Sequence, residues 1–224
     1  DRLIYTFFKQ YNSVVNNYKK AINERQALLK KDDFDESWIE KLELDIVKFG
    51  SVIYDNRLEH IKKINKIIDN LTILENNFYN FYLKIYDVFL DNFSNIYKNE
   101  DEYLSELKKN RKIDLYSGGC SVGPHRSDII GFSKLDEFNI NQFSTGQQKS
   151  IIILIIIAQC MFLIENYNIK PIILLDEVCS HLDNHNRELL LYLINDLNLQ
   201  VFMTGTEKKY FSFLSTKAHY CNIT

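Results

Sequence analysis

Two adjacent carboxylates, Asp176 and Glu177, are the side chains in this sequence whose position best suits chemistry. They follow an apolar run, residues 172–175, that opens after Pro171 and contains no polar residue. Such a run is typical of a parallel strand that is buried on both faces. Open α/β sheets bind their ligands beyond the carboxyl ends of the strands, so both carboxylates are candidates for a ligand site. The alternative is a strand that ends in a solvated acidic turn.

A second candidate site is the polar stretch Phe-Ser-Thr-Gly-Gln-Gln-Lys at residues 143–149, directly before the apolar segment 150–164. The apolar segment predicts a buried helix, and Ser144, Thr145 and Gly146 would form the turn that opens it. Free backbone N–H groups at a helix amino terminus attract anions, and glycine allows a phosphate to approach closely. The turn is therefore a candidate phosphate site, and an ordinary cap before a core helix is the simpler alternative.

Strands and helices alternate in the second half of the chain, residues 114–224. This alternation predicts an α/β lobe in which a mostly parallel sheet has flanking helices. A cluster of glycines at residues 118–119 marks the boundary with the first half. We expect strands near residues 129–132, 138–140, 172–175, 200–206 and 218–223, and helices over 150–164, 184–197 and 208–214.

Residues 1–113 predict an all-α arm domain. Apolar residues recur at helical spacing over residues 2–31, 38–68, 74–97 and 100–111, and an acidic stretch at 32–37 offers a cap for the second helix. Nineteen basic and nineteen acidic residues balance in this half, as in long amphipathic helices that pack on one another. Its basic clusters, such as Lys19-Lys20, are more often solvated helix faces than DNA contacts. The aromatic residues between 78 and 93 are interpreted as core.

Composition and charge exclude several classes of protein. The net charge of −3 gives no overall case for nucleic-acid binding, so any DNA contact must be a local patch. The four cysteines form neither a CxxC motif nor a Cys/His cluster, which disfavours zinc and fits a reducing cytosol. The apolar segment 151–164 is shorter than the roughly 20 residues of a membrane span and is interpreted as a buried helix. No signal peptide opens the sequence, and its start at Asp1 inside a helical pattern suggests a fragment.

Four motifs occur in a fixed order: STGQQK, IILLDE, SHLD and VFMTGTE. In this order they resemble the signature motif, Walker B motif, D-loop and switch strand in the distal lobe of an ABC-type ATPase head. The segment GPHRSD, the form STGQQK and the segment LLDEVCSHLD narrow the resemblance to the RecF family of bacterial DNA replication and repair proteins. The segments DRLIY and NERQALLK and the lone Trp38 extend it to the arm, so it covers essentially the whole chain.

The resemblance implies a role for each residue that matches a motif. Asp176 would be the Walker B carboxylate linked to Mg²⁺, and Glu177 would be the catalytic base. Ser144 and Gly146 would contact the γ-phosphate of ATP bound to the opposite protomer. The other implied site residues are Thr145, Gln147 and Lys149 in the signature motif, Ser180, His181 and Asp183 in the D-loop, and Thr206 at the switch position.

Three further residues are Thr206 at the switch position and His125 and Arg126 in the GPHRSD segment. Thr206 has no imidazole and can only hydrogen-bond, which fits slow hydrolysis. For His125 and Arg126 a structural role in the loop and a contact with DNA or a partner subunit remain open alternatives.

For the whole protein, the resemblance implies an ATP-dependent DNA-binding protein of the bacterial cytoplasm. It would dimerise around ATP, bind single-stranded DNA and gapped junctions, and aid RecA loading with RecO- and RecR-type mediators. No GxxxxGK[ST] loop occurs in the sequence, so the phosphate cradle would lie upstream of Asp1. An SMC- or Rad50-like head is disfavoured because the arm is too short for long coiled coils, and a transporter ATPase because nothing links the chain to a membrane subunit. A non-catalytic DNA-binding or interaction module with a degenerate head is a further alternative, against which the intact carboxylate pair argues.

Overall fold

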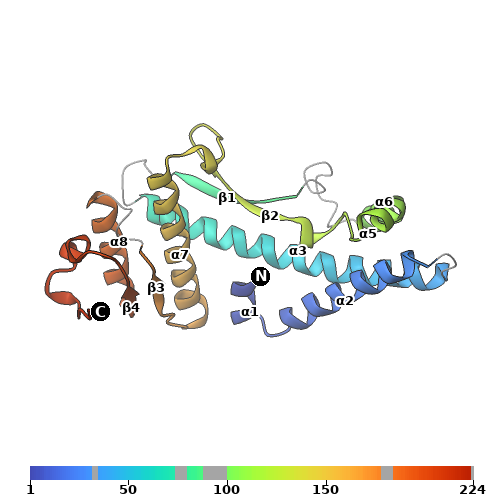
Figure 1. Ribbon diagram of the computed structural model, residues 1–224, viewed down its shortest axis with the longest axis horizontal. Coiled ribbons are helices and arrows are strands. Elements are labelled where there is room, and N and C mark those ends of the chain that lie inside the picture. The colour runs from blue at the N-terminus through green and yellow to red at the C-terminus, as the bar shows by residue number, and fades with distance from the viewer. Residues whose placement is uncertain (32–34, 74–79, 88–99, 178–183, 223–224) are drawn as a thin grey trace. The chain divides into compact units, whose positions relative to one another are not determined.

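The structure of the chain is a computed structural model that describes residues 1–31, 35–73, 80–87, 100–177 and 184–222 (Figure 1). Its contacts divide the chain into two compact units. Unit 1 comprises Asp1–Lys62 and Leu83–Ile130, and unit 2 comprises Lys63–Tyr82 and Gly131–Thr224. These borders differ from the division that the sequence suggested. The assignment of an arm to residues 1–113 and of an ATPase lobe to 114–224 stays a prediction.

Unit 1 is mainly helical, as the sequence predicted. Its helices are α1 (Arg2–Phe7), α2 (Tyr11–Leu29), the first part of α3 (Glu36–Ile73), α5 (Glu100–Lys109) and α6 (Arg111–Ser117). The expected helix over residues 2–31 is broken at Phe8, whose backbone is extended (φ −113°, ψ 90°). The expected acidic cap is confirmed at Asp35, because its carboxylate accepts a 2.9 Å hydrogen bond from the backbone N–H of Ser37.

The core of unit 1 joins α2 to α3 and α5. Tyr11, Val15 and Tyr18 of α2 are buried in one apolar cluster with Ile46 of α3 and Leu107 of α5. These α2 positions recur at steps of three and four residues, which places them on one face of the helix. The opposite face of α2 is left to solvent.

A buried ion-pair network also holds unit 1 together. The Arg25 guanidinium donates to Glu43 at 3.0 Å and to Asp114 at 2.6 Å. Both carboxylates have 0% exposure, and Arg25 has 1%. Arg111 donates to the second oxygen of Glu43 at 2.7 Å. The network therefore ties α2, α3 and α6 together in a region from which water is excluded.

The third predicted helix, over residues 74–97, is wrong where the structure describes that segment. Residues Phe81–Tyr86 form a strand, β1, which pairs with β2 (Asp128–Ser133) in a two-stranded sheet. Phe81, Leu83 and Ile85 are buried and the residues between them are not, which is the two-residue period of a strand. Phe81 and Ile85 are also four residues apart, so the same apolar positions fit a helix. Residues 74–79 and 88–99 lie outside the described chain.

Unit 2 contains the parallel strands and helices of the predicted α/β lobe. They are α7 (Thr145–Tyr167), β3 (Ile173–Leu175), α8 (Asn184–Leu197) and β4 (Val201–Met203). Strands β3 and β4 pair in parallel, with Leu174 opposite Phe202. An antiparallel bridge between Phe132 and Asn139 confirms the pairing expected near these residues.

Two expectations for the end of the chain are corrected. The predicted helix over 208–214 is a 3₁₀ helix, η5 (Lys208–Lys217). The predicted terminal strand is not formed over residues 218–222, the part of it that the structure describes.

The expectation that the β3 strand is buried on both faces is also wrong for the described chain. Ile173 and Leu175 are buried, whereas Leu174 is 74% exposed and its register partner Phe202 is 53% exposed. One face of the β3–β4 pair is therefore apolar and open. Parallel sheets usually have both faces covered.

Helix α7 is longer than the apolar segment suggested. It has 23 residues and is, by length and composition, apolar enough to cross a membrane. However, 56% of its most apolar window is buried within the protein. A core helix of this hydropathy passes the same test, and the burial agrees with the interpretation of α7 as a core helix.

Candidate functional site

The carboxyl end of β3 carries the two candidate carboxylates, both exposed. Asp176 follows the strand directly, and Glu177 has a left-handed backbone (φ 52°). The hydroxyl of Thr204 donates a hydrogen bond to Asp176, and the backbone N–H of Glu177 donates to the same hydroxyl at 3.1 Å. Thr204 therefore fixes both the Asp176 side chain and the strained turn at Glu177.

Thr204 is a site residue that the sequence analysis missed. It is the first residue after β4, and the parallel register places it beside the end of β3. The backbone N–H of Thr204 also donates to the carbonyl of Leu175 at 3.0 Å, which continues the pairing beyond the strands. Its position directly after a strand that pairs with the strand of Asp176 is the feature from which the sequence could have identified Thr204 as a site residue. Thr206, the predicted switch residue, is exposed two positions further on, and its role stays a prediction.

The second candidate site is the amino terminus of α7. Ser144 caps this helix, since its hydroxyl accepts from the backbone N–H of Gln147 at 3.3 Å. The side chain of Gln147 in turn accepts from the backbone N–H of Ser144 at 2.9 Å, which completes a capping box. The Gln148 side chain donates to the carbonyl oxygens of Asn141 and Phe143, at 2.9 and 2.8 Å, and so holds the chain that leads into the turn.

The α7 turn is open to a ligand. Ser144 and Thr145 are exposed, and a Cβ built on Gly146 would meet no atom within 4 Å. Lys149 is half-buried in the second turn. A long helix with an exposed, glycine-containing first turn can hold an anionic oxygen through its backbone N–H groups.

The two candidate sites lie on different elements, α7 and β3, and the remaining predicted residues cannot be added to them. Ser180, His181 and Asp183 lie outside the described residues. In the part of the chain that is described, no group of three or more His, Cys, Asp and Glu side chains could hold a metal ion. Asp176 and Glu177 can supply one or two ligands, which fits Mg²⁺ because this ion keeps several waters and binds few protein carboxylates.

The GPHRSD segment forms a loop that is held on the helices of unit 1. His125 Nε2 lies 2.7 Å from the Cys120 carbonyl, and Nδ1 lies 2.9 Å from the Tyr18 hydroxyl. A carbonyl only accepts, so Nε2 carries the proton and Nδ1 accepts from Tyr18. Gly123 has a φ of +127°, and a Cβ there would collide with the Tyr18 hydroxyl. These contacts favour the structural role for His125.

Arg57 of α3 fixes the other side of this loop. Its guanidinium donates to the Pro124 carbonyl and, at 2.6 Å, to the Ser127 hydroxyl. It also forms an ion pair with the Asp1 side chain at 2.6 Å. Arg126 and His125 are both exposed, but both ring nitrogens of His125 are hydrogen-bonded within unit 1, so the alternative of an external contact applies to Arg126.

We expect His125 to make the stability of the protein pH-dependent. Burial lowers the pKa of His125 below its ordinary 6.5, and the charge of Arg126 adds to this effect. Below pH 6.5 the unfolded chain therefore binds a proton that the folded protein does not, so this stability is present above about pH 6.5 and is lost as the pH falls. Urea unfolding of the wild type and of His125→Gln between pH 7.5 and 5 checks the result. The wild type should show the steeper loss, and equal slopes would contradict a neutral ring that is held by Tyr18 and the Cys120 carbonyl.

Comparisons with known proteins add to this geometry. No family model matches the chain. A solved structure described as the recombination mediator protein RecF-ATPrS in the RecFOR pathway matches with a TM-score of 0.75 and 22% identity, over 93% of this chain and 56% of that one. A second, described as RecF-ATP, matches with a TM-score of 0.71. The fold of the chain is therefore that of the matching part of these RecF structures.

The sequence relatives agree with the fold. The "DNA replication and repair protein RecF" of Rickettsia conorii is 32% identical over 219 residues, which is 97% of this chain and 60% of that protein. The RecF of Rickettsia prowazekii is 32% identical over 92% of this chain and 57% of its own length. The chain thus spans about 60% of the curated relatives it matches. The resemblance to RecF is confirmed over nearly the whole chain, and the matched part is carboxyl-terminal.

Proposed function

We propose that this chain supplies the arm and distal ATPase lobe of a RecF-like, ATP-dependent DNA-binding protein of replication and recombinational repair. The observation that carries the proposal is the open, capped turn at Ser144 in a chain that resembles RecF over nearly its whole length. The solved RecF structures described with ATP and ATPrS support ATP as the ligand. In this proposal the protein acts with DNA and with RecO- and RecR-type mediators in the bacterial cytoplasm.

The α7 turn would hold the terminal phosphate of ATP that is bound to a second protomer. Ser144 would offer its hydroxyl, and Gly146 would leave room for the phosphate oxygens at the backbone N–H groups. Thr145, Gln147 and Lys149 would line the same surface. ATP bound to one protomer would then contact the α7 turn of the other through its terminal phosphate and so hold the two heads together.

The carboxylates of β3 would divide two tasks. Asp176, oriented by the Thr204 hydroxyl, would hold Mg²⁺ through water. Glu177 would accept the proton of the attacking water. Its side chain is exposed, so the carboxylate oxygens are accessible to that water. Because Thr204 is bonded to the backbone of Glu177, its role is to position the base.

The open apolar face of the β3–β4 pair supports a composite head. Leu174 and Phe202 lie on this face, and by strand alternation Asp176 and Thr204 point to the same side. We propose that the polypeptide carrying the phosphate-binding loop covers these apolar residues. The loop would then lie next to Asp176, as a shared magnesium site requires.

The test is the oligomeric state of the intact protein with Ser144 replaced by arginine. Ser144→Arg should weaken ATP-dependent dimerisation by about 10- to 100-fold, because a charge-assisted hydrogen bond to phosphate is lost and a bulky side chain fills the turn. Sedimentation with and without ATP measures the effect. Asn166→Arg introduces the same charge at the far end of α7 and should leave dimerisation unchanged. ATP-dependent dimerisation that survives Ser144→Arg would contradict the proposal and favour a degenerate, non-catalytic head.

A further inference from the structure

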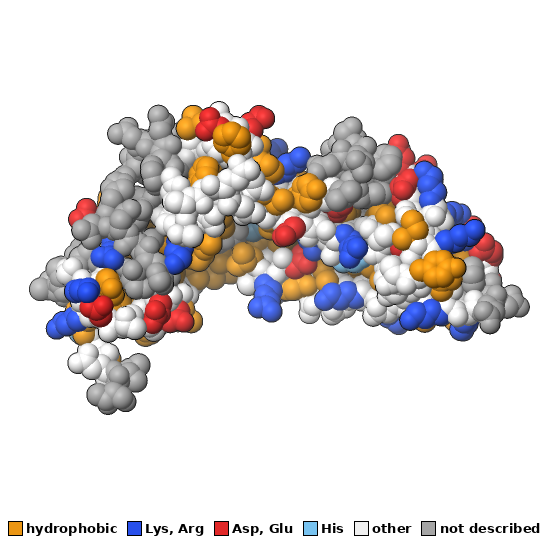
Figure 2. Space-filling view, turned by 45° about the horizontal axis from the view of Figure 1, so that its top comes forward, with side chains coloured by type: hydrophobic (Ala, Val, Ile, Leu, Met, Phe, Trp, Pro, Cys, Tyr) orange, Lys and Arg blue, Asp and Glu red, His pale blue; other side chains and the backbone are white. Residues whose placement is uncertain are grey.

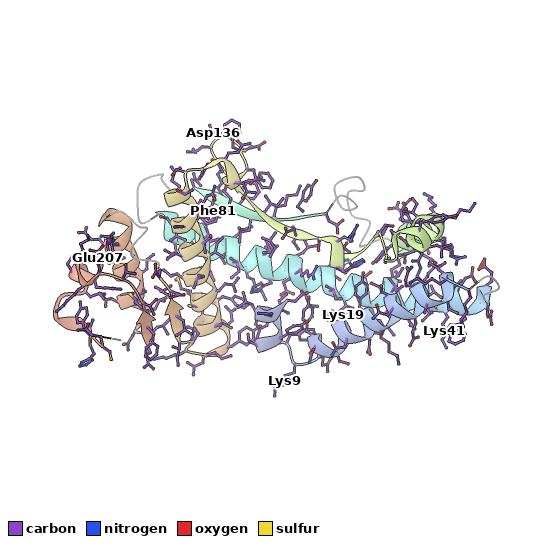
Figure 3. All side chains as sticks on the ribbon, viewed as in Figure 1. Lys9, Lys19, Lys41, Phe81, Asp136 and Glu207 are labelled. Carbon is purple, nitrogen blue, oxygen red and sulfur yellow. The ribbon has the colours of Figure 1, made fainter. Side chains whose placement is uncertain are left out.

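Exposed cations gather on the solvent-facing side of the first helices of unit 1. Residues 2–31 contain a single carboxylate, Glu24. We define the α2 cationic face by the exposed lysines on α2 and directly beside its ends, which are Lys19 and Lys20 on the helix, Lys9 before it, and Lys30 and Lys31 after it. Within the described chain, only Lys20 of this set forms an ion pair, with Glu24 at 3.8 Å. Lys9 and Lys19 are labelled in Figure 3, and Figure 2 shows Lys and Arg side chains among other types along the lower edge of the view.

A second pair of lysines follows the last residue of α2, Leu29. Lys30, the C-cap residue, still has a helical backbone (φ −79°, ψ −8°) and lies eleven positions after Lys19, which is about three helical turns or roughly 16 Å along the axis. The same side of α2 also exposes four side-chain amides that can donate hydrogen bonds: Asn12, Asn16, Asn17 and Asn23. Lysines interleaved with amides suit contacts with phosphate and sugar oxygens.

The rest of unit 1 does not share this charge pattern. The exposed face of α3 in this unit mixes three lysines with four acidic residues: Lys41, Lys48 and Lys62 with Glu36, Glu40, Asp55 and Glu59. Helix α5 begins with Glu100, Asp101 and Glu102 and ends with Lys108 and Lys109, which form ion pairs with Glu40 and Glu106. The exposed lysines of α3 and α5 thus lie among acidic residues, whereas residues 2–31 carry one carboxylate in a chain whose net charge is −3.

The other side chains of this face indicate whether a protein, single-stranded nucleic acid or a duplex fits it best. In the described structure, none of the large exposed hydrophobic residues lies on α2, whereas protein interfaces have apolar cores that are poor in lysine. The aromatic residues of α2, Tyr11 and Tyr18, are buried, so the face offers no platform for stacking unpaired bases. The α2 cationic face therefore offers a partner lysine charges and side-chain amide donors, without an apolar centre or an exposed aromatic ring.

We propose that the α2 cationic face binds the phosphate backbone of duplex DNA without reading its base sequence. DNA as the polyanion rests on the proposed function, but this surface does not depend on the ATP site. Such binding releases counterions, so it weakens steeply with salt, with a slope of about −0.9 in log K against log salt for each phosphate contact.

The test compares two triple variants of the intact protein. Lys19→Gln/Lys30→Gln/Lys31→Gln neutralises the face, and Lys41→Gln/Lys48→Gln/Lys62→Gln neutralises three lysines of α3 as a matched control. Glutamine keeps helix propensity close to that of lysine. With a random-sequence duplex, the first variant should bind at least about tenfold more weakly at 0.1 M salt, with its salt slope reduced by up to about 2.7. The control should match the wild type.

Three results would overturn the inference. These are unchanged duplex binding by the first variant, an equal loss in both triple variants, and a loss confined to polyglutamate or to single-stranded DNA. Sedimentation with ATP separates this inference from the proposed function. The α2 triple variant should dimerise normally with ATP even though its DNA binding falls, whereas failure of the proposed function appears as ATP-dependent dimerisation that survives Ser144→Arg.

Discussion

Replacing Arg25 by methionine is expected to lower the free energy of unfolding by about 3–5 kcal/mol. Methionine fills a similar volume but leaves Asp114 without its cation, in a place where the carboxylate has 0% exposure. Glu43 keeps Arg111 but loses its second partner. The Leu107 carbonyl also loses a donor that lies at 2.8 Å. Urea denaturation followed by circular dichroism measures the change.

An exposed ion pair provides the control for this prediction. Lys108 and Glu40 lie 2.7 Å apart, but their side chains are 41% and 52% exposed. Lys108→Met should therefore cost less than about 1 kcal/mol, since water replaces the lost partner. If Arg25→Met were as mild as Lys108→Met, the carboxylates around Arg25 would have to be hydrated, which is contrary to the structure.

The Arg25 network also shows where sequence patterns stop being informative. The amphipathic spacing of α2 and α3 predicts these helices, and the acidic stretch 32–37 predicts a cap, which the structure places at Asp35. Arg25 looks from its neighbours like a solvated charge. Its partner Asp114 lies 89 positions away, so only the fold can bring the two together.

In the candidate site, too, contiguous motifs could be predicted from the sequence, whereas contacts between distant residues could not. STGQQK and IILLDE are contiguous motifs, and the structure places them at a helix start and a strand end as expected. Thr204 acts through the parallel register of β3 and β4, and His125 through Tyr18, which is 107 positions away. Strand β1 was missed because its apolar residues fit both the period of a helix and that of a strand. In the folded protein its residues are buried alternately, which is the two-residue period of a strand.

Replacing Glu177 by glutamine in the intact protein is expected to slow ATP hydrolysis by about 10²- to 10⁴-fold. Glutamine has the size of glutamate but cannot take a proton from water. The backbone N–H of residue 177 would still donate to Thr204, so the turn itself should persist. Phosphate release at saturating ATP measures the effect. Glu188→Gln, at an exposed position on α8, should leave the rate unchanged.

The oligomeric state of the Glu177→Gln protein tests the central claim most directly. If this lobe forms half of an ATP-bridged site, sedimentation should show a dimer that forms with ATP, persists because hydrolysis is blocked, and is absent without nucleotide. Adding Ser144→Arg to the same protein should return it to the monomer. A Glu177→Gln protein whose oligomeric state is the same with and without ATP would contradict the account.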